Sequence, residues 1–212
     1  KDLAEEALPE IWRYINQLIA VTDARGLMCV GLGDWCAPYN PRSPLQFTTS
    51  VVCMDLFRKA AFLFKEFNRP AQAAFCQTQA ENLRAAIRRH LIDWSNYTAV
   101  GCNSPHTGSQ TSQAMAIYYD VFTEEEKPAA FRVLLEKIRE ETAELQECLD
   151  QGRDIQEELG DLLFAAVNVA RMQDVDPEEA LLRATQKFMK RFALVEQKAG
   201  TALKTMSIDE MT

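Results

Sequence analysis

Hydrophobic residues recur at intervals of three and four positions along most of this chain of 212 residues. That spacing places them on one face of an α-helix, so the pattern predicts helices over residues 3–19, 48–67, 71–91 and 109–122. No segment alternates hydrophobic and polar residues over more than a few positions, as a half-buried β-strand would. The sequence therefore predicts an all-α fold.

The second half of the chain predicts three further helices with clear boundary signals. Pro128 and the acidic residues before it indicate a first helical turn, so a helix should cover residues 124–149. Another should cover residues 155–172. Asp176 predicts the N-cap of a last helix over residues 177–199, with a proline at its first position.

Two long segments, residues 25–44 and 93–109, separate helices of the first half. Both contain glycine and proline, so the sequence predicts loops there. Loops of this length between helices are usually either functional or disordered.

Charge and composition exclude several classes of function. The net charge of −8 argues against nucleic acid as a partner. No apolar run approaches the roughly 20 residues of a membrane-spanning helix, so no membrane partner is expected. Residues 131–212 carry 17 acidic and 11 basic side chains, a net charge of −6, so the acidity is concentrated in the second half.

Six cysteines are scattered without a C-x-x-C motif or regular spacing. This usage is typical of free thiols in a reducing compartment, which predicts a cytoplasmic protein. Cys53, Cys76 and Cys148 lie in apolar helical patterns and are expected to be small core residues. The other three lie in the loop-like segments, namely Cys29, Cys36 and Cys102.

Two carboxylate pairs of identical spacing are the main candidate chemistry. Glu141 and Glu144 share a face of one predicted helix, and Glu158 and Asp161 share a face of the next. Antiparallel helices joined by a short turn would bring the pairs together. Four converging carboxylates repel one another unless cations lie between them, and oxygen-only ligands suit Mg²⁺ or Mn²⁺. One such pair alone usually marks an exposed helix face, whereas two favour a metal site.

The helix that carries Glu158 and Asp161 is expected to be largely buried. Its carboxylates are interspersed with an apolar series, Leu159, Leu162, Leu163 and Val167. Gly160 lies in the middle of this helix, where glycine costs roughly 1 kcal/mol relative to alanine. We therefore expect another backbone to approach closely at Gly160.

Lys187 and Arg191 are four residues apart in the last predicted helix and share a face beside Phe188 and Phe192. A cationic face opposite metal-bound carboxylates would suit a triphosphate. The alternative is an ordinary basic patch on an exposed helix.

Four motifs in residues 131–212 carry a family resemblance: "KIREETAELQE", "IQEELGDLLFAAVNVAR", "PEEALLRATQKFMKRFALVEQ" and "MSIDEM". They resemble the MazG-type nucleoside triphosphate pyrophosphohydrolases. The resemblance implies an all-α helical bundle that is generally dimeric. It also implies Mg²⁺-dependent cleavage of a nucleoside triphosphate between its α- and β-phosphates, giving the monophosphate and pyrophosphate.

The resemblance implies roles for seven residues. The metal ligands would be Glu141, Glu144, Glu158 and Asp161, the phosphate-binding residues would be Lys187 and Arg191, and Asn168 matches the asparagine of "VN-x-AR". Two features depart from the family pattern. The helix that precedes the first carboxylate pair has no recognisable counterpart, and Asp154 replaces a lysine ahead of the second pair.

The first half carries "GLGDWCAP" and "SQTSQAMAIYYDVFTEEEKPAAFRVLLEKI". With these motifs, residues 1–138 resemble part of the helical-toroid catalytic domain of α-L-rhamnosidases. The resemblance implies antiparallel helical hairpins of a partial α/α toroid, with Gly33, Asp34 and Trp35 lining a sugar pocket. The family's general acid and base have no counterpart here, so packing is the simpler role for Trp35 and His106.

The predicted organisation is a toroid-like part over residues 1–130 and a MazG-like part over residues 131–212, joined through one continuous helix. Natural fusions usually join domains through exposed linkers, so a recombined or engineered chimera is a hypothesis. Three functions stay open: a pyrophosphohydrolase, a helical scaffold without catalysis, and a rhamnosidase-like carbohydrate-binding fragment. A homodimer is expected, because a partial toroid leaves apolar helix faces uncovered.

Overall fold

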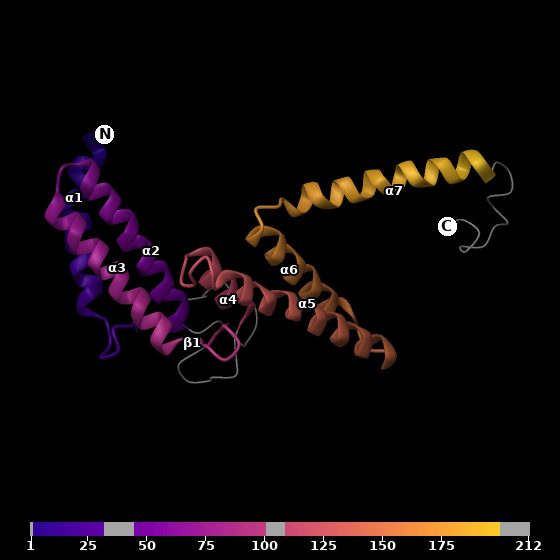
Figure 1. The fold of residues 1–212 in the computed structure, drawn as a ribbon, viewed down its shortest axis with the longest axis horizontal. Helices are drawn as coiled ribbons and strands as arrows, with labels where there is room; N and C mark the ends of the chain where they lie inside the picture. The colour runs from indigo at the N-terminus through magenta and orange to yellow at the C-terminus, as the bar shows by residue number, and fades with distance from the viewer. Residues whose placement is uncertain (1, 32–44, 101–108, 200–212) are drawn as a thin grey trace. The chain divides into compact units, whose positions relative to one another are not determined.

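The computed structural model describes residues 2–31, 45–100 and 109–199, and it divides the chain into two compact units, Lys1–Ala165 and Ala166–Thr212 (Figure 1). The predicted all-α fold is confirmed, since the described residues form helices and only one small two-stranded sheet. The domain boundary between residues 130 and 131 stays a prediction.

The first unit contains five complete helices: α1 (Asp2–Ala20), α2 (Leu45–Glu66), α3 (Pro70–His90), α4 (Gln110–Tyr118) and α5 (Lys127–Asp150). Helix α6 (Gln156–Met172) begins in this unit and ends in the second, which also contains α7 (Pro177–Ala199). Most predicted helix ends agree with the structure to within three residues. Helix α4 ends earlier than predicted, because Asp120 has a left-handed backbone with φ of 56°.

The segment between α3 and α4 was expected to be a loop without strands, and this expectation is wrong. Strands β1 (Ile92–Asp93) and β2 (Thr98–Ala99) pair antiparallel, with Ile92 opposite Ala99. Tyr97 takes a left-handed φ of 61° just before β2. Strands of two residues are too short to show an alternating pattern in the sequence.

Helices α1, α2 and α3 form the main hydrophobic core. Helices α2 and α3 lie side by side as an antiparallel hairpin (Figure 1). The indole of Trp12 on α1 packs edge-on against Phe64 of α2 and Phe75 of α3, with ring centroids 5.8 and 5.2 Å apart. Cys53 and Cys76 are buried free thiols within this core, as predicted. Burial raises the pKa of Cys76 to about 11, so its thiol stays protonated near neutral pH.

A buried glutamine, Gln113, joins the β1–β2 pair, α4 and α5. The amide nitrogen of Gln113 donates to the main-chain oxygens of Tyr97 (2.9 Å) and Ala130 (2.8 Å). Its amide oxygen accepts from the main-chain N–H of Ala99 at 2.7 Å. A buried amide is costly unless its polar atoms are hydrogen-bonded, so these three bonds select one arrangement of the three elements.

Three arginines of α2 and α3 bind the main-chain carbonyls that follow α4. Arg58 donates to Tyr119 at 2.7 Å, Arg84 to Asp120 at 2.6 Å and Arg88 to Val121 at 2.9 Å. These carbonyls lie just beyond the last turn of α4, and the guanidinium groups hold this segment against the α2–α3 hairpin.

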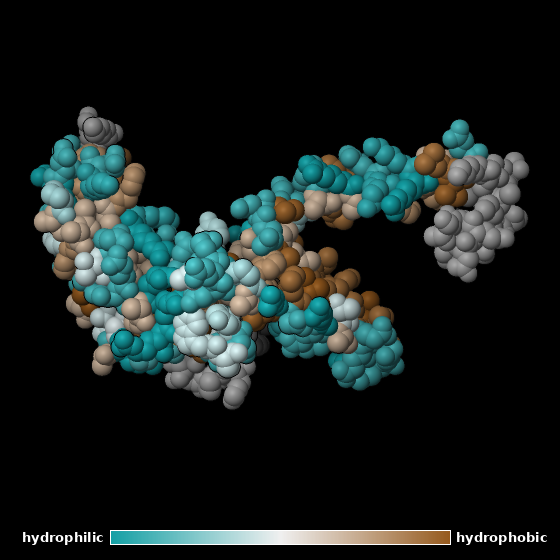
Figure 2. Space-filling view, viewed as in Figure 1, coloured by the Kyte–Doolittle hydropathy of each residue, from teal (hydrophilic) through white to brown (hydrophobic). Residues whose placement is uncertain are grey.

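Helix α6 differs from its prediction, because it is largely exposed. Among its apolar residues, Leu159 and Leu163 are 41% and 60% exposed, and hydrophobic surface lies over this helix in Figure 2. A Cβ added at Gly160 would meet no atom within 4 Å, so the expected close backbone approach is wrong for the described residues. An apolar pattern predicts a face that can be buried, and Leu159 and Leu163 have little cover among the described residues of the first unit.

In the second unit, α7 begins as predicted. The Asp176 carboxylate accepts from the main-chain N–H groups of Glu178 (2.9 Å) and Glu179 (3.1 Å), which confirms it as the N-cap. The rings of Phe188 and Phe192 stack with centroids 5.9 Å apart on the exposed surface of α7. No helix among the described residues has both the length and the apolar character to cross a membrane.

Candidate metal centre

Three carboxylates from α5 and α6 converge. One oxygen each of Glu141, Glu158 and Asp161 lies within 4.8 Å of the others. The chain reverses between the two helices at Gly152, whose left-handed φ of 64° suits glycine. The main-chain N–H of Arg153 then donates back to the last turn of α5 at 2.9 Å. This tight reversal lets carboxylates of consecutive helices meet, and it brings together three of the four residues that were expected to converge.

Glu141 is the most enclosed member of the group, with 4% of its surface exposed. Two donors bind the same oxygen, Oε1: Nε2 of Gln110 lies at 3.1 Å and Nζ of Lys137 at 3.4 Å. Lys137 also contacts Glu140 at 2.8 Å. Burying a carboxylate without such partners costs free energy. The amide of Gln110 and the ammonium of Lys137 therefore stabilise the buried carboxylate of Glu141.

The pKa of Lys137 is raised even though partial burial alone would lower it. The hydrogen bond to Glu140 and the negative charges of Glu140 and Glu141 favour the ammonium form. Lys137 therefore remains a full positive charge beside the carboxylate group at neutral pH.

The Cys148 thiol also contacts the carboxylate group, and its sulfur lies 3.5 Å from Oε1 of Glu158. Burial, and then the hydrogen bond to Glu158, raise the pKa of Cys148. The Cys148 side chain is thus a protonated thiol that donates a weak hydrogen bond to Glu158. Cys148 is buried, as the sequence predicted.

Glu144 lies on α5, one turn beyond Glu141, and its side chain is exposed. In the described part of the chain, the close group contains Glu141, Glu158 and Asp161 but not Glu144. Desolvation and the charge of Glu141 raise the pKa of Glu144, with smaller effects from Glu140 and Glu158. The role of Glu144 as a fourth ligand stays a prediction.

The donor set fits a hard divalent cation. Every member offers a carboxylate oxygen, the ligand type that Mg²⁺ and Mn²⁺ prefer. Three carboxylates at this separation repel one another, and Lys137 brings only one positive charge to them. A divalent cation would supply the charge that the side chains lack.

The remaining predicted site residues lie in the second unit. Asn168 of α6 is 6% exposed, and its Nδ2 has no hydrogen-bond partner in the described part of the chain. Lys187 and Arg191 lie on α7, and both are exposed. Their roles as nucleotide-binding residues stay predictions.

Comparison with known proteins identifies both halves of the chain. The bacterial alpha-L-rhamnosidase 6 hairpin glycosidase domain matches residues 1–147. The chain belongs to this family. The MazG nucleotide pyrophosphohydrolase domain matches residues 130–195, which confirms the MazG resemblance of the segment that carries the carboxylates. The two matches overlap within α5, so the rhamnosidase-type and MazG-type parts share one helix.

Individual relatives match the MazG-type part. The nucleoside triphosphate pyrophosphohydrolase/pyrophosphatase MazG of Thermotoga maritima is 47% identical over 79 residues, which cover 36% of this chain and 31% of that protein. The nucleoside triphosphate pyrophosphohydrolase of Escherichia coli is 42% identical over 69 residues, or 30% of this chain and 26% of that protein. The match therefore spans less than a third of either relative. No solved structure matches the chain.

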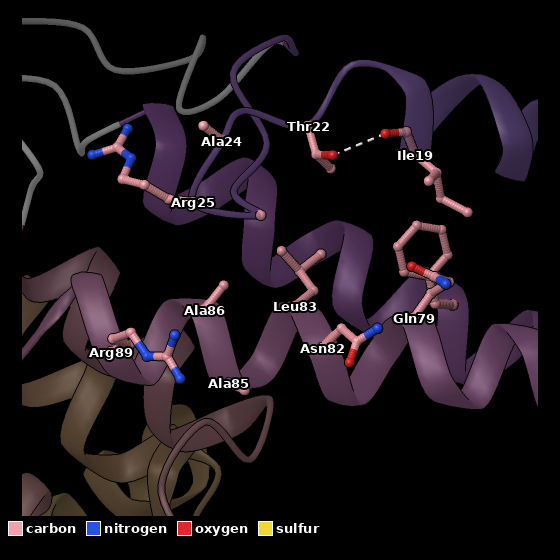
Figure 3. A pocket seen from close by; sticks show the side chains of 12 residues that line it. Ile19, Thr22, Ala24, Arg25, Gln79, Asn82, Leu83, Ala85, Ala86 and Arg89 are labelled. Carbon is pink, nitrogen blue, oxygen red and sulfur yellow. Dashed lines mark hydrogen bonds between the residues drawn. The ribbon is translucent and has the colours of Figure 1, made fainter.

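The rhamnosidase-type part contains a separate cavity of about 410 Å³. Figure 3 shows Gln79, Asn82 and Arg89 of α3 on one side and Thr22 and Arg25 on the other. None of the described residues that line this cavity carries a carboxylate, whereas glycoside hydrolysis uses a pair of them. The residues predicted for a sugar pocket lie outside the described residues, namely Gly33, Asp34 and Trp35, as do His106, Cys36 and Cys102.

Two residues that contact the Glu141 carboxylate were not predicted from the sequence. Lys137 precedes Glu141 by four residues, a helix spacing that could have indicated an ion pair. Gln110 lies 31 residues before Glu141, in the rhamnosidase-type part, and no local pattern connects them.

Proposed function

We propose that the MazG-type part of this chain binds a nucleoside triphosphate with Mg²⁺ or Mn²⁺ and hydrolyses it to a monophosphate and pyrophosphate. The observation that carries the proposal is the meeting of Glu141, Glu158 and Asp161 within a segment of MazG type. An oxygen-only group of this kind is suited to a cation that also contacts phosphate oxygens.

In this proposal, Glu141, Glu158 and Asp161 hold the cation, and Glu144 contributes from its exposed position one turn away. A bound Mg²⁺ would neutralise phosphate charge and lower the pKa of a coordinated water. Lys187 and Arg191 bind the phosphates, and Asn168 hydrogen-bonds the nucleotide through its unpartnered amide nitrogen. Positive side chains would stabilise the charge that develops on the departing pyrophosphate.

The test is pyrophosphate release from a panel of nucleoside triphosphates with Mg²⁺. We expect the wild type to release pyrophosphate and a variant with Glu158→Gln and Asp161→Asn to lose release almost completely. A variant with Glu5→Gln and Glu6→Gln removes the same charge from the exposed surface of α1 and should keep full activity. Absence of release by the wild type would leave the scaffold hypothesis for this part.

A homodimer is part of the proposal. Helix α7 exposes large apolar side chains, including Leu181, Phe188 and Met189 at 69%, 66% and 64% of their surface. Exposed apolar surface of this extent on one helix is typical of a protein interface, and a second copy of the chain is the partner we propose.

We also place the protein in the cytoplasm. Nucleoside triphosphates are abundant in that compartment, and a reducing environment keeps thiols free. The described cysteines, Cys29, Cys53, Cys76 and Cys148, are all free, as this proposal requires.

A further inference from the structure

Gln110 connects α4, which lies outside the MazG match, to the carboxylate group. It is the first residue of α4 and lies before the MazG match, which begins at residue 130. Its Nε2 donates to Oε1 of Glu141 at 3.1 Å. Glu141 is the buried member of the group, so this bond forms where solvent competes least.

We propose that Gln110 is a positioning residue for cation binding at the group formed by Glu141, Glu158 and Asp161. The inference rests on the cation site of the proposed function and assigns part of that site to α4, which lies outside the MazG match. Gln110 fixes the carboxylate of Glu141 in the orientation that faces Glu158 and Asp161.

The backbone that carries Gln110 is held firmly. Ser109 caps α4, and its Oγ accepts from the main-chain N–H of Ser112 at 3.0 Å. Gln113, one turn further along, donates to the main-chain oxygen of Ala130 at 2.8 Å and so fastens α4 to α5. Gln110 therefore reaches Glu141 from a fixed helix end, which reduces the entropy lost when the amide binds the carboxylate.

The second donor to Glu141 cannot replace this function. Lys137 lies on the same helix as Glu141, and its Nζ is 3.4 Å from the Glu141 carboxylate. The same Nζ lies closer to the Glu140 carboxylate, at 2.8 Å. A flexible ammonium group supplies charge but fixes direction poorly, whereas a planar amide carries no charge and fixes direction. Residues that hydrogen-bond a ligating carboxylate orient it for the metal.

Gln110 also has an unused polar atom. Its Oε1 is buried and accepts no hydrogen bond in the described part of the chain. Unpartnered buried oxygens are unfavourable, and a water bound to a cation could donate to this one. The same amide would then contact both Glu141 and the hydration shell of the ion.

The experiment measures Mn²⁺ affinity of the full chain by calorimetry, together with the thermal midpoint with and without Mn²⁺. We expect Gln110→Ala to raise the Kd for Mn²⁺ roughly tenfold, as loss of an outer-shell partner typically does. Gln110→Met keeps the length of the side chain without the amide and should weaken binding equally. Gln146→Ala is the matched control, because Gln146 of α5 donates to the exposed Asp150. The Mn²⁺ affinity of this variant should equal that of the wild type.

Unchanged Mn²⁺ affinity in Gln110→Ala would overturn the positioning role, even if the variant unfolds at a lower temperature without Mn²⁺. Absence of Mn²⁺ binding by the wild type would overturn both this inference and the cation site of the proposed function. A wild type that binds Mn²⁺ in a Gln110-dependent way without releasing pyrophosphate would overturn only the proposed hydrolysis.

Discussion

Arg88 of α3 and Glu126, the residue before α5, form a two-pronged ion pair with distances of 2.6 and 2.8 Å. The guanidinium also lies 4.6 Å from the centre of the Trp94 ring. Both side chains of the pair are about four-fifths buried, with 24% and 21% exposed. The helix that carries Glu141 is thereby attached at its start to the core of the rhamnosidase-type part.

This pair predicts a loss of stability in acid. The hydrogen bond from Arg88, assisted by the main-chain N–H of Thr123, lowers the pKa of Glu126 from 4.5 to about 2. A carboxylate with a lowered folded-state pKa stabilises the fold fully above its unfolded pKa, and the contribution disappears as the pH falls through the folded value. We expect Glu126→Gln to lower the free energy of unfolding by about 1–3 kcal/mol at pH 7.

Chemical denaturation across a pH series checks this prediction. The difference in the free energy of unfolding between wild type and Glu126→Gln should be constant above about pH 4.5. It should fall toward zero as the pH approaches about 2. Glu179→Gln is the control, because Glu179 pairs with Arg183 on the exposed surface of α7, where an ion pair contributes little. A difference independent of pH would contradict the assigned pKa.

Two glycines give opposite predictions. Gly160 lies within α6, and a Cβ there would meet nothing within 4 Å, so Gly160→Ala should raise the free energy of unfolding by about 0.5–1 kcal/mol. Gly152 has the same open surroundings but a left-handed φ of 64°, so Gly152→Ala should destabilise by roughly 1 kcal/mol. Urea denaturation with EDTA present measures both. Destabilisation by Gly160→Ala would indicate a backbone contact with a second copy.

The carboxylates of α5 should differ in their effect on cation binding. Glu141 belongs to the close group and Glu144 does not, so Glu141→Gln should weaken Mn²⁺ binding by more than roughly tenfold and Glu144→Gln by only a few-fold. Calorimetric titration of each variant gives the comparison. Equal losses would mean that Glu144 moves into the group when the cation binds, as the four-ligand prediction requires.

The exposed face of α7 predicts concentration-dependent association. Phe188→Asp places a charge among the exposed apolar side chains and should convert a dimer into a monomer in light scattering. Arg183→Asp changes charge on the same helix at a residue outside that apolar set and should leave the mass unchanged. A wild type that remains monomeric at all accessible concentrations would refute the proposed dimer.

The helices and their ends were predictable because they depend on neighbours in the sequence. The N-cap at Asp176 is an example, since its carboxylate accepts from main-chain groups only two and three residues away. The short pair of β1 and β2 escaped prediction, because it depends on the buried amide of Gln113 from the following helix.

The sequence alone determined the all-α class, the two family resemblances and the pairing of Glu141 with Glu144 and of Glu158 with Asp161 on their helix faces. These features follow from residue identity and from the fixed geometry of a helix turn. Only the tertiary structure decided that Glu141, Glu158 and Asp161 meet while Glu144 stays exposed, and that Gln110 donates to Glu141. Contacts between residues far apart in the chain depend on how helices pack, and helix periodicity does not encode that packing.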